Sequence, residues 1–119
     1  ISAARQIQPK EERDLARIKK AMTYMQQNFS CKVSLEDVAQ VVAISKSELC
    51  RCFRRVLKVS PMEYLIQFRL EEASRQLLST DKSVTQIALE TGFDSSSHLG
   101  RFFLKEFGCT PRQYRGRKR

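Results

Sequence analysis

Tryptophan is absent from this chain of 119 residues, and histidine occurs only once, as His98. No apolar run approaches the roughly 20 residues that a membrane-spanning helix requires. No segment resembles a secretory signal peptide, which would need a basic start, an apolar stretch and a cleavage site. The sequence therefore predicts no contact with a membrane, and we expect a cytoplasmic protein.

Cysteine is scarce and badly placed for a disulfide framework or a metal site. Cys50 and Cys52 would point to different faces of a helix, and the remaining two, Cys31 and Cys109, lie far away in the sequence. No CxxC pair accompanies the single histidine, so zinc ligands with the usual spacing are missing. Reduced thiols fit better, and we expect neither a metal nor a cofactor.

Enzymatic machinery is also lacking. The chain has one histidine, no acid and base paired at a glycine-rich loop, and no motif that marks an activated nucleophile. The inventory argues against an enzyme.

Basic residues, by contrast, are abundant. Lysine and arginine number 22 against 13 acidic residues, which gives a net charge of +9 and a pI near 9.8. Such a balance is typical of domains that bind nucleic acid. The length allows one ordinary domain or two very small units that support each other.

A repeat is the most informative feature of the sequence. Residues 34–64 recur further along the chain with one extra residue, Asp94, in the second copy. A duplicated unit in a basic chain indicates two equivalent elements held at a fixed separation, and duplex DNA has the regular spacing to match them. The recurring residues, each followed by its counterpart, are Ser34 and Ser83, Leu35 and Val84, Val38 and Ile87, Ala39 and Ala88, Ile44 and Phe93, Ser45 and Ser95, Leu49 and Leu99, Arg51 and Arg101, Phe53 and Phe103, Pro61 and Pro111, and Tyr64 and Tyr114.

Each copy has the pattern of a short helix, a turn and a second helix. In the first copy Ser34 caps a helix over about 35–42, and Ser45 caps the next. Ala43 occupies the turn between them, where it implies either a differently shaped turn or a small strain. The inward residues of the second helix are Leu49, Cys52, Phe53 and Val56.

The second copy repeats this pattern with better turn chemistry. Ser83 caps a short helix to about Thr91, Gly92 suits a left-handed turn, and Ser95 caps the following helix. Its inward residues are Leu99, Phe102 and Phe103.

Four further segments complete the expected organisation. Residues 1–13 are a polar linker or N-terminal extension, and an amphipathic helix starts at Asp14 with Leu15, Ile18, Ala21, Met22, Met25 and Phe29 on one broad face. Residues 60–80 form a longer joining helix capped by Ser60, and 116–119 form a basic tail. We therefore predict an all-α fold of two helix-turn-helix units, about 14–59 and 81–115, joined by a linker helix over about 60–80.

The pattern also resembles a known family. The stretches SLEDVAQVVAISKSELCRCFRRVLKVSPMEYL and IALETGFDSSSHLGRFFLKEFGCTPRQYR look like the two helix-turn-helix motifs of AraC/XylS-type transcriptional regulators. The resemblance covers about residues 14–115. It implies a domain of seven helices, the third and sixth of which enter successive major grooves. It also implies an effector-binding or dimerisation domain outside this fragment, and RNA polymerase as a further partner of the activators in the family.

Candidate DNA contacts follow from helical geometry and coincide with the positions that the family uses. Arg51 and Arg101 are the leading base readers, because a guanidinium matches guanine O6 and N7; phosphate contact or a surface ion pair is the alternative. The predicted base-reading residues are Ser47, Cys50, Arg51, Ser96, Ser97, Gly100 and Arg101. The predicted DNA-backbone residues are Ser45, Lys46, Arg54, Arg55, Lys58, Ser95, His98, Lys105, Arg112 and Arg115.

Most of the outward residues are small, so we expect few direct contacts with base edges. DNA shape, bridging waters and close approach of the protein backbone should then account for a larger share of the sequence specificity. The outward residues also differ between the two copies, which predicts an asymmetric site with two unlike halves about 34 Å apart. The alternative function is an all-helical protein-interaction module. That alternative leaves the clustering of Arg51, Arg54, Arg55 and Lys58 unexplained.

Overall fold

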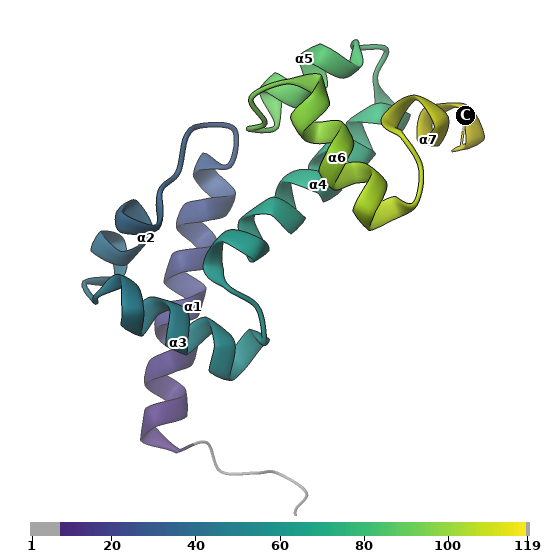
Figure 1. The fold of residues 1–119 in the computed structure, drawn as a ribbon. Coiled ribbons are helices and arrows are strands. Elements are labelled where there is room, and N and C mark those ends of the chain that lie inside the picture. Colours follow the sequence, from purple (N-terminus) through teal and green to yellow (C-terminus); the bar gives the residue numbers. More distant parts are fainter. Residues whose placement is uncertain (1–7, 119) are drawn as a thin grey trace, which may run out of the picture.

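The computed structural model describes residues 8–118, and in that range it consists of helices without strands, which confirms the predicted all-α fold (Figure 1). Two lobes lie at opposite ends of α4, the first built by α1–α3 and the second by α5–α7. The molecule is flat, with extents of 49 × 40 × 21 Å. The helices are α1 (Pro9–Asn28), α2 (Leu35–Val42), α3 (Lys46–Leu57), α4 (Pro61–Ser79), α5 (Val84–Glu90), α6 (Ser96–Phe107) and α7 (Pro111–Lys118).

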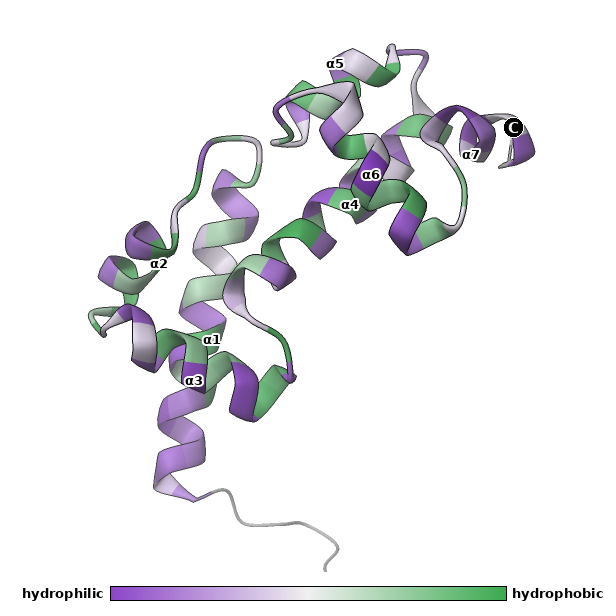
Figure 2. Ribbon diagram, viewed as in Figure 1, coloured by the Kyte–Doolittle hydropathy of each residue, from purple (hydrophilic) through white to green (hydrophobic). Residues whose placement is uncertain are grey.

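Each lobe has its own hydrophobic core, and α4 contributes to both. Leu65, near the start of α4, packs into the first core, whereas Leu70, Ala73 and Leu77 belong to the second. Apolar residues accordingly recur along α4 in Figure 2. Because one continuous helix enters both cores, the lobes are joined without a flexible linker.

Serine caps define the helix starts, as the sequence predicted. The hydroxyls of Ser34, Ser45, Ser60, Ser83 and Ser95 each accept a hydrogen bond from the backbone N–H three residues ahead. At α2 and α4 the third helical residue is acidic and bonds back to the N–H of the capping serine, which completes a capping box. These local bonds satisfy backbone donors that a helix start otherwise leaves unpaired.

The two ends of the chain are more helical than predicted. α1 begins at Pro9 rather than Asp14, because proline suits the first helical position and Glu11 and Glu12 favour the positive end of the helix dipole. α7 runs to Lys118, so residues 116–118 of the predicted tail are helical. Residues 1–7 of the predicted extension and Arg119 of the tail lie outside the described range.

Candidate nucleic-acid interface

The turn of each helix-turn-helix has left-handed backbone at one residue. Gly92 has φ +92° in the second unit, as its lack of a Cβ allows, whereas Ala43 has φ +61° in the first. The positive φ of Ala43 supports the expectation of a small strain, since a side chain in this conformation costs about 1–2 kcal/mol. The buried alanines Ala39 and Ala88 lie on the first helix of each unit, as small residues at the predicted helix crossing should.

The predicted faces of α3 are confirmed. Leu49, Cys52 and Phe53 are fully buried, while Val56 is only partly so. On the other side, Ser47 and Arg51 are exposed and Cys50 is partly exposed. The further exposed residues at the start of α3 and along it are Ser45, Lys46, Arg54 and Lys58.

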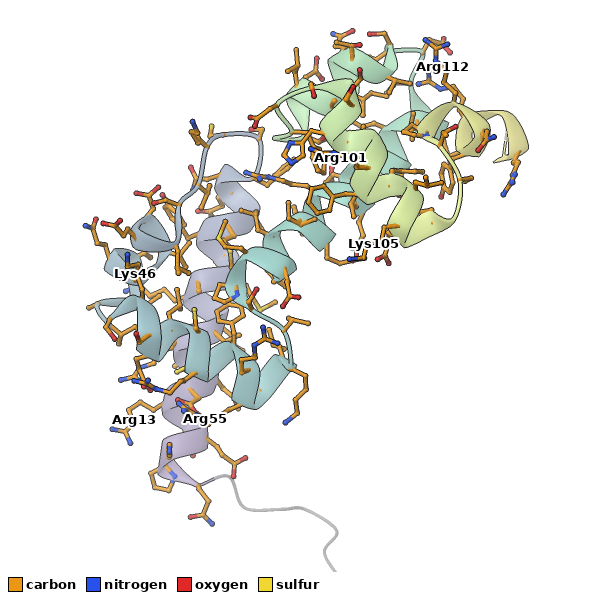
Figure 3. The ribbon with its side chains drawn as sticks, viewed as in Figure 1. Arg13, Lys46, Arg55, Arg101, Lys105 and Arg112 are labelled. Atoms are coloured by element: carbon orange, nitrogen blue, oxygen red, sulfur yellow. The ribbon has the colours of Figure 1, made fainter. Side chains whose placement is uncertain are left out.

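α6 presents an equivalent surface in the second lobe. Leu99 and Phe103 are fully buried, and Phe102 is partly buried. Arg101 and Lys105 extend from α6, one turn apart (Figure 3), and Arg101 has no ion-pair partner within residues 8–118. The remaining predicted contact residues here are exposed or partly exposed: Ser95, Ser96, Ser97 and Gly100.

Several cations on the first unit are held by acidic neighbours at the surface. Arg51 Nε donates to Glu48 Oε1 at 3.1 Å, Arg54 Nη2 lies 3.5 Å from Glu63 Oε1, and Lys46 Nζ lies 3.7 Å from Glu36. These arginine and lysine side chains are more than half exposed, and such pairs contribute little to stability. They can therefore be exchanged for contacts with phosphate or base edges.

Arg55 differs from its neighbours, because its guanidinium pairs with a buried carboxylate on α1 (Figure 3), although the Arg55 side chain is still 35% exposed. Its guanidinium donates two hydrogen bonds to the buried Asp14 carboxylate, at 3.0 and 3.2 Å, and a third to Glu48 at 3.1 Å. The bonds from Arg55 lower the pKa of Asp14 most, and Cys52 and Arg17 add to the effect. Arg55 and Arg51 likewise lower the pKa of Glu48.

Sequence reasoning missed this network, although Asp14 lies in register with the buried Ile18, Ala21 and Met25 of α1. This register with buried apolar residues was the signal in the sequence that Asp14 is buried and needs a partner.

The same network brings together groups of the kind that bind metals. Ligand atoms of Asp14, Glu48 and Cys52 lie within 4.8 Å of one another. However, Arg55 and Arg17 already neutralise both carboxylates, and the Cys52 thiol donates to Asp14 Oδ1 at 3.2 Å. Burial and the bond to Asp14 raise the pKa of Cys52, which keeps the thiol protonated. The cluster is an ion-pair network that joins α3 to α1, rather than a set of ligands prepared for a metal.

Two of the predicted backbone contacts in the second unit have partners within the protein. Arg115 donates to the carbonyl oxygens of Leu77 at 2.9 Å and Thr80 at 3.2 Å, so it satisfies acceptors at the end of α4. His98 Nδ1 accepts the Asp94 N–H at 3.2 Å, and its ring packs edge-on against Phe102.

Arg112, in the second unit, is exposed at the start of α7 (Figure 3). In the first unit, the exposed Lys58 donates from Nζ to the Arg55 carbonyl oxygen at 3.1 Å.

Within residues 8–118, no helix combines the length and apolar character needed to cross a membrane.

Comparison with known proteins supports this geometry. A helix-turn-helix domain family matches residues 38–117. The transcriptional activator RhaS of Enterobacter sp. (strain 638) is 36% identical over 104 residues, which cover 87% of this chain and 37% of that protein. The chain spans about a third of the length of the curated relatives it matches.

Two solved structures have the same fold over most of the chain. An AraC-type transcriptional regulator from Chromobacterium violaceum aligns with a TM-score of 0.82 and 32% identity, covering 87% of this chain and 93% of that one. The DNA-binding domain of AdpA, solved in complex with a target DNA, aligns with a TM-score of 0.81 and 26% identity, covering 85% and 91%.

Proposed function

Because the chain belongs to the AraC/XylS family of helix-turn-helix domains, we propose that it is the part of a transcriptional regulator that binds double-stranded DNA in a sequence-specific manner. In this proposal α3 and α6 enter successive major grooves on one side of the duplex. The observation that carries the proposal is the pair of recognition helices, one in each lobe, each burying one face and presenting an arginine on the other. The 49 Å extent of the molecule accommodates a groove spacing of about 34 Å.

Arg51 and Arg101 occupy corresponding positions in the repeat and are the base readers in this proposal. Each guanidinium has a planar fork that suits guanine, and a bidentate contact discriminates by about 1–3 kcal/mol. The two arginines differ in the protein without DNA, because Arg51 is paired with Glu48 and Arg101 has no ion-pair partner within the described residues.

The smaller outward residues, Ser47, Cys50, Ser96, Ser97 and Gly100, allow the helix backbone to come close to the base pairs. Lys46, Arg54, Lys58, Lys105 and Arg112 supply phosphate contacts, together with the capping serines Ser45 and Ser95.

Arg55 and Arg115 have a different role in this proposal from the one their charge suggested. Their guanidinium groups are occupied by Asp14 and Glu48 in one case and by the end of α4 in the other. Each arginine therefore orients the helix that carries or supports a DNA contact, and contacts phosphate only if it gives up hydrogen bonds within the protein. His98 is similarly engaged through Nδ1 in the turn before α6.

The complete regulator is proposed to be longer than this chain. Support comes from the share of its relatives that the chain spans, about a third, and from the transcriptional activator RhaS among them. We infer that a further domain binds an effector or mediates dimerisation, that the protein is cytoplasmic, and that RNA polymerase is a partner when DNA is bound. An enzymatic activity has no support in the residues described.

A salt titration of DNA binding tests the proposal. Anisotropy of a labelled random duplex, measured between low and moderate salt, should give a log–log slope of about −5 if about six phosphates are contacted. Arg112→Ala should make this slope less steep by about one, at every DNA sequence. Arg101→Ala should instead reduce the preference for a selected site over random DNA. A slope near zero would favour the alternative, a protein-interaction module.

A further inference from the structure

A buried arginine lies on α4 at the point where one core ends and the other begins. Arg69 follows Leu65 of the first core by one helical turn and directly precedes Leu70 of the second, and it is only 7% exposed. It has no carboxylate partner at ion-pair distance within residues 8–118. A charged side chain in such a place requires another kind of compensation, because burial of an unpaired charge is costly.

The compensation comes from the first lobe. Arg69 Nε donates to the carbonyl oxygen of Phe29, and Nη2 donates to that of Cys31, each at 2.9 Å. Phe29 is the residue at which α1 ends, so Arg69 satisfies acceptors that the helix terminus leaves free. Burial lowers the pKa of Arg69, and the charge of Asp94 acts in the opposite direction. Arginine nevertheless stays charged under all ordinary conditions.

The second lobe closes over the same guanidinium. Gly92, in the turn between α5 and α6, lies so close that a Cβ added there would overlap Phe29 O and Arg69 Nε and come within 2.9 Å of Arg69 Cζ. The turn of the second helix-turn-helix therefore touches both the end of α1 and the side chain of α4. Asp94, the residue inserted in the second copy of the repeat, belongs to this turn and lines a cleft of about 320 Å³ beside Arg69.

We propose that Arg69 and Gly92 form a clamp that fixes the orientation of the two recognition helices relative to each other. α4 alone sets the distance between the lobes, but a long helix bends at modest cost. A second contact away from the axis of α4 resists such bending. Arg69 is thus a positioning residue for two-site DNA recognition, and this inference rests on the proposed function.

The consequence for binding is an effective-concentration effect. When one recognition helix is seated, a rigid connection presents the other at its groove, whereas a loose connection spreads it over many orientations. The clamp should therefore increase affinity for a complete site over an isolated half-site, and it should make binding sensitive to the spacing of the two halves. It should not change the affinity for one half-site.

The test compares Gly92→Ala with Gly108→Ala. Both glycines have positive φ, +92° and +72°, so the added methyl group meets a backbone penalty at each. Only at Gly92 does the Cβ collide with another element, since nothing lies within 4 Å of a Cβ at Gly108. Arg69→Met provides a second variant, which keeps an unbranched apolar stem and removes the donors to α1.

Affinities are measured by anisotropy for a selected complete site, for each half-site, and for sites with two base pairs inserted between the halves. We expect the advantage of the complete site, about 100-fold in the wild type, to fall at least about tenfold in Gly92→Ala and Arg69→Met. In these two variants the affinity for each half-site should stay unchanged, and the difference in affinity between the complete site and the sites with inserted base pairs should become smaller. Gly108→Ala should behave as the wild type. Equal behaviour of Gly92→Ala and Gly108→Ala, together with an unchanged Arg69→Met, would overturn the clamp.

A second measurement does not depend on DNA. Residual dipolar couplings, fitted separately for each lobe, should give one alignment tensor in the wild type and in Gly108→Ala, and differing tensors in Arg69→Met. If the wild type bound no DNA, the proposed function would fail, and these couplings would still decide whether the lobes are clamped. Coinciding tensors in Arg69→Met would refute the clamp even if DNA binding were confirmed.

Discussion

At the scale of single residues, charge is divided between side chains that face solvent and side chains that hold the fold. Arg51, Arg101 and Lys105 are exposed on α3 and α6, and the Arg51 bond to Glu48 lies at the surface, while Arg55, Arg69 and Arg115 donate to buried or backbone acceptors within the protein. A basic composition alone therefore overstates the number of cations available to DNA. Substitution of a buried charged residue should therefore affect stability more than substitution of an exposed one.

Asp14→Asn should destabilise the protein in a manner that depends on pH. The lowered pKa of Asp14 means that its contribution to stability is present above the ordinary carboxyl pKa and is lost as pH falls through the lowered value. At pH 7 the variant should lose about 1–3 kcal/mol of unfolding free energy, because it weakens a hydrogen-bonded pair with Arg55. Urea unfolding of the wild type and of Asp14→Asn, measured from pH 7 to 3, should show their free energies of unfolding converging as the pH falls.

Glu36→Gln is the matched control for that experiment. Glu36 pairs with Lys46 at 3.7 Å, but its side chain is 69% exposed, so its removal should change stability very little at any pH. An Asp14→Asn protein as stable as the Glu36→Gln control at pH 7 would contradict the role assigned to the α1–α3 network.

Gly100→Ala should separate stability from binding. A Cβ at Gly100 meets nothing within 4 Å, and alanine in a helix interior is about 0.5–1 kcal/mol more favourable than glycine. Thermal unfolding should therefore occur at a higher temperature in the variant. If α6 approaches the base pairs closely at Gly100, DNA affinity should fall despite the gain in stability; unchanged or tighter binding would exclude that close approach.

At the scale of elements, the two turns show how one motif tolerates different residues. The turn after α2 places Ala43 at φ +61°, a conformation that glycine adopts without a steric penalty. We expect Ala43→Gly to raise the free energy of unfolding by about 0.5–1 kcal/mol, since the relief of 1–2 kcal/mol is partly offset by the larger entropy of glycine when unfolded.

The control for this substitution is Ala16→Gly. Ala16 is exposed within α1, where glycine should cost about 1 kcal/mol. Chemical denaturation should therefore shift the two variants in opposite directions. A loss of stability in both would show that the turn at Ala43 is not strained.

The elements were predicted more completely than the contacts between them. Serine caps and apolar spacing place α2, α3 and α6 accurately, because both signals are local. Asp14 and Arg69 escaped prediction because a charged residue within an apolar stripe is ordinarily assigned to solvent. Only tertiary structure shows that Arg55 of α3 compensates the first and that carbonyl groups at the end of α1 compensate the second.

At the scale of the whole molecule, the duplicated unit becomes a pair of unequal surfaces, which we propose as the two DNA-recognition surfaces. The first has Ser47, Cys50 and Arg51, and the second has Ser97, Gly100 and Arg101. Because α4 enters both cores and Arg69 joins the lobes, the two surfaces are held apart as one body. One chain should thus recognise two different half-sites in a fixed order.

Selection of bound duplexes from a random library, with this chain as the only protein, tests the central claim most directly. The account predicts an enriched asymmetric site whose two unlike halves lie about one helical turn apart, about 34 Å, with a fixed spacing. Guanine should be enriched in each half, because each recognition helix presents a proposed base-reading arginine, Arg51 on α3 and Arg101 on α6. A palindrome bound by a single chain, or no enrichment at low salt, would contradict the account.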